Sequence, residues 1–567
     1  MTRPRDRYDV WWRDAVVYQV YPRSFADSDG DGIGDLGGVL ERLDHLAHLG
    51  VDVVWLSPIY PSPQDDNGYD VSDYREVDPV FGDLGTLDAL TEELHRRDMR
   101  LVLDLVVNHT SDEHPWFLDS ASGIDSARRD WYWWRPPRAG FAGGEPGAEP
   151  NNWSGFFSGS TWEFDPASDE YYLHLFSRKQ PDLNWENRDV RAAVHDTMNW
   201  WLDRGIDGFR MDVINLVSKV PSLPDAPTRP GSRFGDGFPF YASGPRIHEF
   251  MQEMHREVFR GRDVPILSIG EMPGVTIPDA ADFTDPARAE LDMVFQFEHM
   301  GLDHGPDGKW SGAELDRGSL MDTLMRWQVG LADRGWNSLY WNNHDQPRVV
   351  SRFGDPGRFW RESATALAAV LHLQRGTPFI YQGEELGMTD MPFGSVDELR
   401  DIESLNYVAE ALAEDPEALP RVLERIRRIG RDNARTPVQW DAGPSAGFTS
   451  GEPWIPVNPN HVTINAAAQR DDPESVYAFY RELIALRHRE PLVVTGDFRR
   501  IEATDAVVSF ARERDGEALV LRANLSGEPV ESADPGGELV LGNHREPSRD
   551  GRLLPWEVVV TRSRLAP

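Results

Sequence analysis

The sequence predicts an α/β protein: a (β/α)8 TIM barrel with a small domain inserted after the third strand and a C-terminal antiparallel β-domain. Three observations lead to this prediction. Strand-length apolar runs alternate with segments of helical period, which is typical of a parallel sheet covered by helices. A long aromatic-rich interval interrupts the series after its third strand. Beyond about residue 492 the pattern changes to short alternating strands.

Eight runs rich in β-branched and aromatic residues are expected to be the barrel strands. They cover residues 15–21, 51–57, 101–108, 206–213, 266–271, 293–297, 338–342 and 378–382. Most segments between them carry apolar residues at helical spacing. Between the first two runs, apolar side chains from Leu36 to Ala47 fall on one helical face, and Gly50 takes the position after a helix end. Eight such units favour closure into a barrel.

Two long intervals set the predicted domain boundaries. Residues 1–109 form the first part of the barrel, 110–180 the inserted domain, 181–490 the second part of the barrel with a subdomain at about 384–473, and 491–567 the C-terminal β-domain. Both intervals follow a barrel strand. Long loops in that position commonly carry function.

Composition narrows the class of partner. The chain of 567 residues has 58 Lys and Arg against 95 Asp and Glu, and its net charge of −37 argues against nucleic acid or an anionic membrane as a partner. It has no cysteine, which excludes disulfides and thiolate metal sites. Residues 1–12 are rich in charge where a secretory signal needs an apolar core, and no apolar run is long enough to span a bilayer. We therefore expect a cytoplasmic protein.

Polar residues gather at the carboxyl ends of the predicted strands, where barrel enzymes carry their chemistry. They are Asp104, Asn108 and His109 on the third strand, Arg210 and Asp212 on the fourth, Glu271 on the fifth, and Asn342, Asn343, His344 and Asp345 on the seventh. Arg210 and Asp212 share one face of their strand, either as a structural ion pair or as part of a site. Because polar residues occur at the carboxyl ends of four different strands, we interpret them as one functional site instead of as separate solvated strand ends.

Several carboxylates facing one pocket suit cleavage of a glycosidic bond, in which one carboxylate is the nucleophile and another the proton donor. Metal-dependent hydrolysis also uses His and Asp at strand ends. It fits less well, because the chain has no His-Glu-x-x-His helix and no closely spaced histidine pair on a strand.

Residues 27–35 form an acidic, glycine-rich loop with the oxygen spacing of a calcium site. The predicted ligands are the carboxylates of Asp27, Asp29, Asp31 and Asp35 and the carbonyl of Ile33. The twelfth position is Gly38 instead of the bidentate glutamate of an EF-hand, so we expect structural Ca²⁺ with fewer protein ligands. The alternative is an acidic turn without an ion, in which the carboxylates would repel one another.

Five segments together resemble glycoside hydrolase family 13, the α-amylase family, and within it the α-glucosidase and oligo-1,6-glucosidase group. Residues 104–109, 208–215, 268–272 and 342–345 are similar to the four signature segments of the family, in the same order. Residues 180–184, Gln-Pro-Asp-Leu-Asn, resemble the segment that marks the oligo-1,6-glucosidase-like group. The resemblance runs along nearly the whole chain.

The resemblance implies a role for each matching residue. Asp212 would be the nucleophile, Glu271 the general acid/base, and Asp345 the residue that binds and distorts the sugar. The remaining implied substrate contacts are His109, His344 and Arg210 around the reacting glucose, Tyr69 as its stacking ring, and Asp66 and Arg431 as the pair that closes the pocket. Val213 follows the nucleophile, and in the family valine at this position goes with a preference for α-1,6 links.

The resemblance thus implies a retaining, exo-acting α-glucosidase whose partner is a short oligosaccharide, preferentially α-1,6-linked, and whose first barrel strand is followed by a calcium loop. Three alternatives stay open. An α-1,4-preferring maltase would use the same site. An α-glucosyltransferase or sucrose isomerase would let a sugar, instead of water, intercept the glucosyl intermediate. A barrel without activity could serve as a binding subunit, although this chain keeps all three carboxylates.

Overall fold

The computed structural model describes residues 10–228, 232–306, 308–534, 536–548 and 551–564, and in these residues eight parallel strands form the central sheet. They are β1 (Val17–Val20), β2 (Val53–Leu56), β3 (Arg100–Val106), β7 (Gly208–Asp212), β8 (Leu267–Glu271), β9 (Met293–Phe295), β10 (Ser338–Leu339) and β11 (Thr377–Tyr381). Their order is β10-β11-β1-β2-β3-β7-β8-β9, and a parallel bridge between Val294 and Asn337 joins the two edges. The predicted barrel is confirmed.

Helices cover the outside of the barrel because each buries one apolar face. Examples are α3 (Leu84–Arg96), α5 (Arg188–Asp203), α7 (Ile247–Met254), α9 (Arg317–Gly330), α11 (Trp360–His372) and α16 (Val476–Arg489). The apolar face expected between the first two strands is divided between α1 (Leu36–Glu41) and α2 (Leu43–Leu49), which meet at Arg42. Gly50 ends α2 with a φ of 96°, as its position in the sequence predicts.

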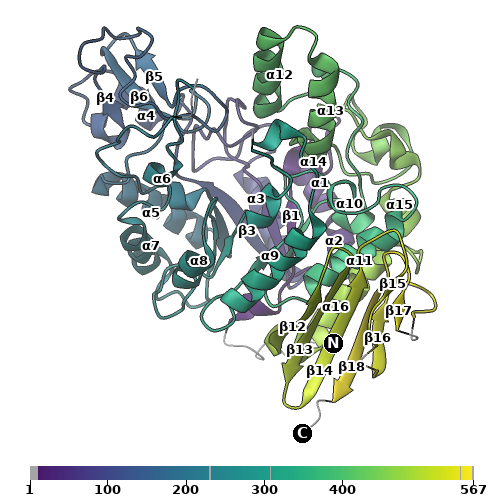
Figure 1. Cartoon of the computed structure of the whole chain (residues 1–567). Coiled ribbons are helices and arrows are strands. Elements are labelled where there is room, and N and C mark those ends of the chain that lie inside the picture. Colours follow the sequence, from purple (N-terminus) through teal and green to yellow (C-terminus); the bar gives the residue numbers. More distant parts are fainter. Residues whose placement is uncertain (1–9, 229–231, 307, 535, 549–550, 565–567) are drawn as a thin grey trace.

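The interval after β3 contains a small antiparallel sheet. Its strands are β4 (Trp134–Arg135), β5 (Trp162–Asp165) and β6 (Glu170–Leu173), in the order β4-β6-β5. The chain returns to the barrel at Asp182 and Leu183, where Leu183 donates a backbone hydrogen bond of 2.8 Å to Asn108. This return anchors the inserted segment to the carboxyl end of β3, above the barrel (Figure 1).

The interval after β11 also rises above the barrel. It contains α12 (Ile402–Glu414), α13 (Leu419–Ile429) and α14 (Asp432–Arg435). Figure 1 shows α12 and α13 at the same end of the molecule as β4 to β6. A hydrogen bond of 3.1 Å from Asn406 Nδ2 to the Phe157 carbonyl joins the two insertions. Both therefore border the end of the barrel at which the predicted site lies.

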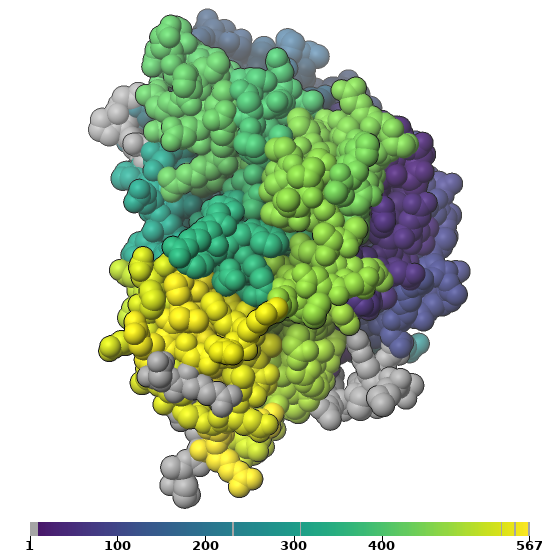
Figure 2. Space-filling model, turned by 90° about the vertical axis from the view of Figure 1, so that its right-hand side faces the viewer, coloured from purple at the N-terminus to yellow at the C-terminus, as the bar shows by residue number. Residues whose placement is uncertain are grey.

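The C-terminal segment forms a separate antiparallel sheet. Its strands run in the order β12 (Asp497–Ala503), β13 (Val507–Arg514), β14 (Glu517–Asn524), β18 (Val558–Arg564) and β16 (Glu538–Gly542). β12 contacts α9 and β14 contacts α11, so the sheet lies against the helical layer of the barrel (Figure 2, yellow). Among the described residues, no helix combines the length and apolarity that crossing a membrane requires. The charged segment 1–9 lies outside the described residues.

A buried ion pair fixes the inserted segment to the barrel. Lys219 Nζ lies 2.8 Å from Asp182 Oδ2, and both side chains are fully buried. The same ammonium also donates to the Leu216 carbonyl and to Asn108 Oδ1, at 2.7 and 3.1 Å. Burial lowers the pKa of Lys219, although Asp182 favours its charged form. Such a pair tolerates the loss of one partner poorly, because the other charge is left buried and alone.

Replacement of the ammonium by an apolar side chain should therefore destabilise the protein strongly. We expect Lys219→Met to lower the free energy of unfolding by about 3–5 kcal/mol, measured by denaturant titration. The double variant Lys219→Met/Asp182→Asn removes both charges and should recover part of this loss. A Lys219→Met protein within about 1 kcal/mol of the wild type would contradict the assignment.

Candidate active site

One buried guanidinium lies at the centre of the candidate site. β3 and β7 pair in register with Asp104 beside Arg210, and β8 is the next strand. Arg210 Nη1 lies 2.9 Å from Asp104 Oδ1 and 2.8 Å from Asp212 Oδ1, and Nη2 lies 2.8 Å from Glu271 Oε2. The Arg210 side chain is 1 % exposed. Three adjacent strands thus bring three carboxylates to one cation.

Burial raises the pKa of Asp212 and of Glu271, in each case to about 7. Arg210 favours the charged form of both, whereas the neighbouring carboxylates disfavour it. A hydrogen bond with Glu271 favours the ionised form of Asp212. The arrangement therefore suits one shared proton, with Glu271 as the acid and Asp212 as the carboxylate. This is the distribution that a proton donor beside a nucleophile requires.

The backbone leaves strand geometry directly after Asp212. The sequence predicts that the strand extends through residue 213, but it ends at Asp212 and Val213 has φ 36° and ψ 40°. The left-handed region is strained for a β-branched residue. In this conformation the Val213 N–H donates a 3.0 Å hydrogen bond to Glu271 Oε2. The strained residue thus holds the candidate acid in place.

A second group of predicted residues lies beside the three carboxylates. The ring of Tyr69 stacks on the ring of His344, with centroids 4.9 Å apart and planes 4° apart. Tyr69 also donates to Asp104 Oδ2 at 3.1 Å, and its carbonyl lies 3.0 Å from His109 Nε2. His344 Nε2 lies 3.1 Å from Asp345 Oδ2. The structure therefore brings these predicted residues together beside Arg210.

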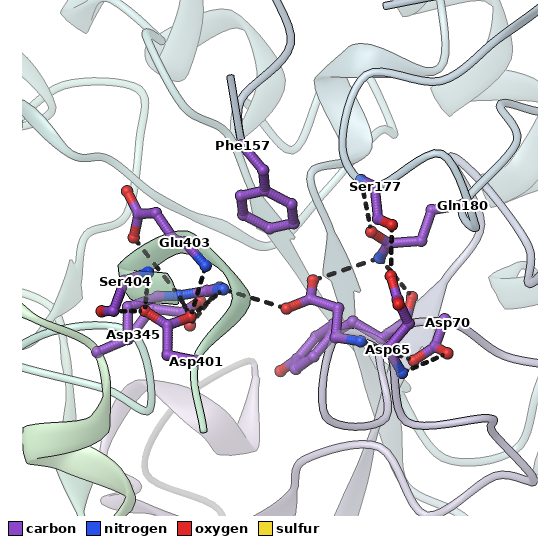
Figure 3. A network of polar contacts seen from close by, with 12 residues as sticks. Asp65, Asp70, Phe157, Ser177, Gln180, Asp345, Asp401, Glu403 and Ser404 are labelled. Carbon is purple, nitrogen blue, oxygen red and sulfur yellow. Dashed lines mark hydrogen bonds and ion pairs between the residues drawn. The ribbon is translucent and has the colours of Figure 1, made fainter. Parts of the chain in front are cut away.

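Arg431 is the second cation of the site; of its acidic partners, Figure 3 labels Asp345, Asp401 and Glu403. Its Nη2 lies 3.1 Å from Asp66 Oδ1 and its Nη1 lies 3.2 Å from Asp345 Oδ1. Burial opposes the charge of Asp345, but His344 and Arg431 outweigh it and hold the pKa of Asp345 well below its usual range. Asp66 and Arg431 are thus paired, as expected from the resemblance.

Two acidic partners of Arg431 were not predicted. Asp401 Oδ1 lies 2.6 Å from Nη2, and Glu403 Oε2 lies 3.5 Å from Nε. Both belong to the start of α12, within an interval whose mixed pattern gave no clear helix. The sequence does contain one signal, because Asp401 stands three residues before Ser404 in the spacing of a helix N-cap. That signal locates a helix end but does not reveal its arginine partner.

The acidic loop after β1 brings part of its predicted ligand set together. Among the described residues, the group whose ligand atoms lie within 4.8 Å of one another is Asp27, Asp29 and Asp35, and Asp31 is not part of it. Asp35 also caps α1 by accepting from Gly38 N at 2.6 Å. The donors are all carboxylate oxygens, which fits a hard cation. Asp31 and the Ile33 carbonyl stay predictions.

Comparisons with known proteins agree with this geometry. A family model described as the α-amylase catalytic domain matches residues 19–496, and a domain of unknown function (DUF3459) matches residues 496–560. An oligo-1,6-glucosidase from Parageobacillus thermoglucosidasius is 52 % identical over 98 % of this chain and 99 % of its own. A glucan 1,6-alpha-glucosidase from Streptococcus pneumoniae is 46 % identical over 92 % of each chain.

The fold has equally extensive matches among solved structures. The trehalose-6-phosphate hydrolase of Bacillus licheniformis superposes with a TM-score of 0.92 at 42 % identity, over 98 % of this chain and 100 % of its own. The isomaltulose synthase of Klebsiella sp. LX3 does so with a TM-score of 0.92 at 38 % identity, over the same shares. The chain therefore belongs to the α-amylase family and is a glycoside hydrolase of family 13.

Proposed function

We propose that this protein is a retaining, exo-acting α-glucosidase that hydrolyses terminal α-linked glucose from short oligosaccharides, with a preference for α-1,6 links. The observation that carries the proposal is the group formed by Arg210, Asp212 and Glu271. A buried guanidinium 2.8 Å from both carboxylates keeps a nucleophile and an acid side by side. Glycosidic cleavage with retention needs this pair of groups.

The proposed reaction has two displacements. Asp212 attacks the anomeric carbon while Glu271 gives its proton to the glycosidic oxygen, so the C–O bond breaks and a glucosyl ester forms. Glu271, now ionised, takes a proton from a water molecule that attacks the same carbon. Glucose leaves with its original anomeric configuration, and both carboxyl groups return to their starting states. Arg210 stabilises the charge that remains on the pair throughout.

Asp66 and Arg431 support cleavage from the chain end. Their ion pair of 3.1 Å joins the loop after β2 to the start of α14, and Asp345 is bound to the same guanidinium. Asp345 keeps 28 % of its side chain exposed, whereas Asp66 keeps 7 %. Asp345 is thus the one of the two with more surface free for sugar hydroxyls, and a pocket closed at one end accepts a terminal glucose.

The preference for α-1,6 links has two supports. Two of the relatives reported above are named oligo-1,6-glucosidase and glucan 1,6-alpha-glucosidase. Val213 stands directly after the proposed nucleophile and is 8 % exposed, close enough to the site to donate to Glu271. The likeness to isomaltulose synthases keeps transfer to a second sugar as the competing reaction on the same intermediate.

Purified protein should release α-glucose faster from isomaltose than from maltose, followed by NMR before mutarotation. Asp212→Asn should lose at least about 10³-fold in kcat, because a nucleophile acts in the transition state. Because the reducing-end glucose of isomaltose is already a mixture of anomers, retention is read from an aryl α-glucoside, from which initial β-glucose would contradict retention. Faster release from maltose than from isomaltose would contradict the linkage preference. Isomeric or longer products from sucrose or isomaltose would assign the protein as a transferase.

The raised pKa of Glu271 also predicts a stability effect. The pKa of Glu271 rises from 4.5 to about 7 on folding. The stability that its protonated form contributes is therefore present at low pH and is lost as the pH rises through 7. Glu271→Gln mimics the protonated acid and should raise the free energy of unfolding at about pH 8, by at most about 3 kcal/mol. At about pH 4, below the ordinary pKa of 4.5, the difference should nearly vanish. Thermal unfolding of both proteins at the two pH values measures this, and an equal shift at both would contradict it.

We further propose that the loop of residues 27–35 holds a structural Ca²⁺ ion. Asp27, Asp29 and Asp35 would supply carboxylate oxygens, with Asp31 and the Ile33 carbonyl as the remaining predicted ligands. Asp27 also accepts hydrogen bonds from Gly30 N and Gly32 N, at 2.7 and 2.8 Å, which support the loop around the ion. The ion would stabilise the loop after β1 and would take no part in the reaction.

Chelator-treated protein should gain thermal stability when Ca²⁺ is added, by about 2–3 kcal/mol at a hundredfold excess over Kd. The variant Asp29→Asn removes a charge from the proposed ligand group and should reduce this gain, whereas Asp73→Asn, outside the loop, should leave it unchanged. A melting temperature that does not respond to Ca²⁺ in the wild type would contradict the site.

A further inference from the structure

Asp401 connects the second cation of the site to a helix. It is fully buried and caps α12 through its Oδ2, which accepts the backbone N–H and the hydroxyl of Ser404 at 3.0 and 2.7 Å. Its Oδ1 accepts from Arg431 Nε at 2.8 Å and lies 2.6 Å from Arg431 Nη2. One carboxylate therefore serves two elements at once; Figure 3 labels Asp401 near Ser404 and Asp345.

Asp401 makes the shortest contacts of Arg431, and the other acidic partner from α12, Glu403, is farther away at 3.5 Å. Both contacts to Asp401 are shorter than 3 Å, whereas those to Asp66 and Asp345 are 3.1 and 3.2 Å. Asp401 is 0 % exposed, so no sugar can reach it. The guanidinium thus makes its shortest contacts to a carboxylate that no sugar touches, and it also donates to Asp66 and Asp345.

Asp401 also neutralises a second arginine. Arg435 Nη1 has no hydrogen-bond partner among the described residues and lies 3.6 Å from Asp401 Oδ1. Arg435 Nη2 donates to Asp345 Oδ1 at 2.9 Å. Without Asp401, the two guanidinium groups would repel each other next to the carboxylate that they share.

We infer that Asp401 is a positioning residue, which fixes Arg431 at the closed end of the glucose pocket and joins it to α12. The inference rests on the proposed function. It makes the affinity for the terminal glucose depend on a carboxylate that does not touch the sugar. It also links the pocket to the inserted domain, because α12 donates from Asn406 to the Phe157 carbonyl and Arg431 lies over the Phe157 ring, 5.0 Å from its centroid.

Asp401→Asn tests the inference with little change of shape. The amide keeps an acceptor for the N-cap but removes the charge that holds Arg431. We expect KM for isomaltose to rise by about tenfold or more, with kcat within about threefold of the wild type. Ser404→Ala removes the hydroxyl on the other side of Asp401 and should leave both constants within about twofold.

A double-mutant cycle with Arg431→Gln separates positioning from a general loss of structure. If Asp401 acts through Arg431, Asp401→Asn should change kcat/KM by less than about twofold in the Arg431→Gln background. Additive effects would overturn the inference. If Asp401→Asn does not fold, Arg431→Lys supplies the test: it keeps the charge but loses the planar fork and should raise KM similarly, so an unchanged KM would overturn the inference.

Failure of the proposed function would be distinguishable from failure of this inference. A wild-type protein that cleaves none of the α-glucosides would contradict the proposed function, and the inference with it. An active wild type whose variants behave additively would contradict the inference alone.

Discussion

The ion pairs of Arg210 are the interaction on which the rest of the site depends. Three carboxylates around one guanidinium leave an excess of negative charge at a place that is almost completely buried. A barrel interior tolerates such an excess when each carboxylate is hydrogen-bonded and when a proton can be retained. Asp104 meets this condition through Trp55 and Tyr69, which donate to its Oδ2 at 3.2 and 3.1 Å. The proton that relieves the repulsion is then the one that the proposed reaction needs. The same electrostatic balance that makes the site compatible with folding therefore prepares its acid.

The fold and the centre of the site follow from the sequence to different extents. Eight strands could be located because barrel strands are short, apolar and separated by helices, and the carboxyl-end residues followed from strand position. Contacts between distant residues could not be found in this way. Arg431 and Asp66 are separated by 365 residues, and their pairing came from the family resemblance alone. Lys219 and Asp401 carry no periodic signal, because a buried charge is recognisable only through its partner. The left-handed backbone of Val213 could not be predicted either, because valine favours a strand conformation.

The two cations of the site are supported by different parts of the fold. Arg210 lies on β7 between two paired strands, so its position is set by the hydrogen-bonded sheet. Arg431 lies in the interval after β11 and is held by side chains from the loop after β2, the loop after β10 and the start of α12. A group that is fixed by the sheet is suited to chemistry that does not vary. A group that is fixed by insertions can change partners as those insertions change. Proteins named as an oligo-1,6-glucosidase and as an isomaltulose synthase both match this chain over nearly its whole length, so one barrel carries more than one named activity.

Val213 is a strained residue directly after the proposed nucleophile and beside the proposed acid. Its left-handed conformation costs of the order of 1–3 kcal/mol, which the surrounding structure must supply. What the protein gains is the N–H that points at Glu271 Oε2, an acceptor that also lies 2.8 Å from Arg210 Nη2. With two donors on one oxygen, the proton of Glu271 is directed to the other oxygen. The residue that the family resemblance connects with linkage preference therefore also donates to the proposed acid. The Val213 side chain itself is 8 % exposed and packs in a hydrophobic cluster with Trp133 and Leu216, so substitution here changes this packing and the strained backbone that holds Glu271 together.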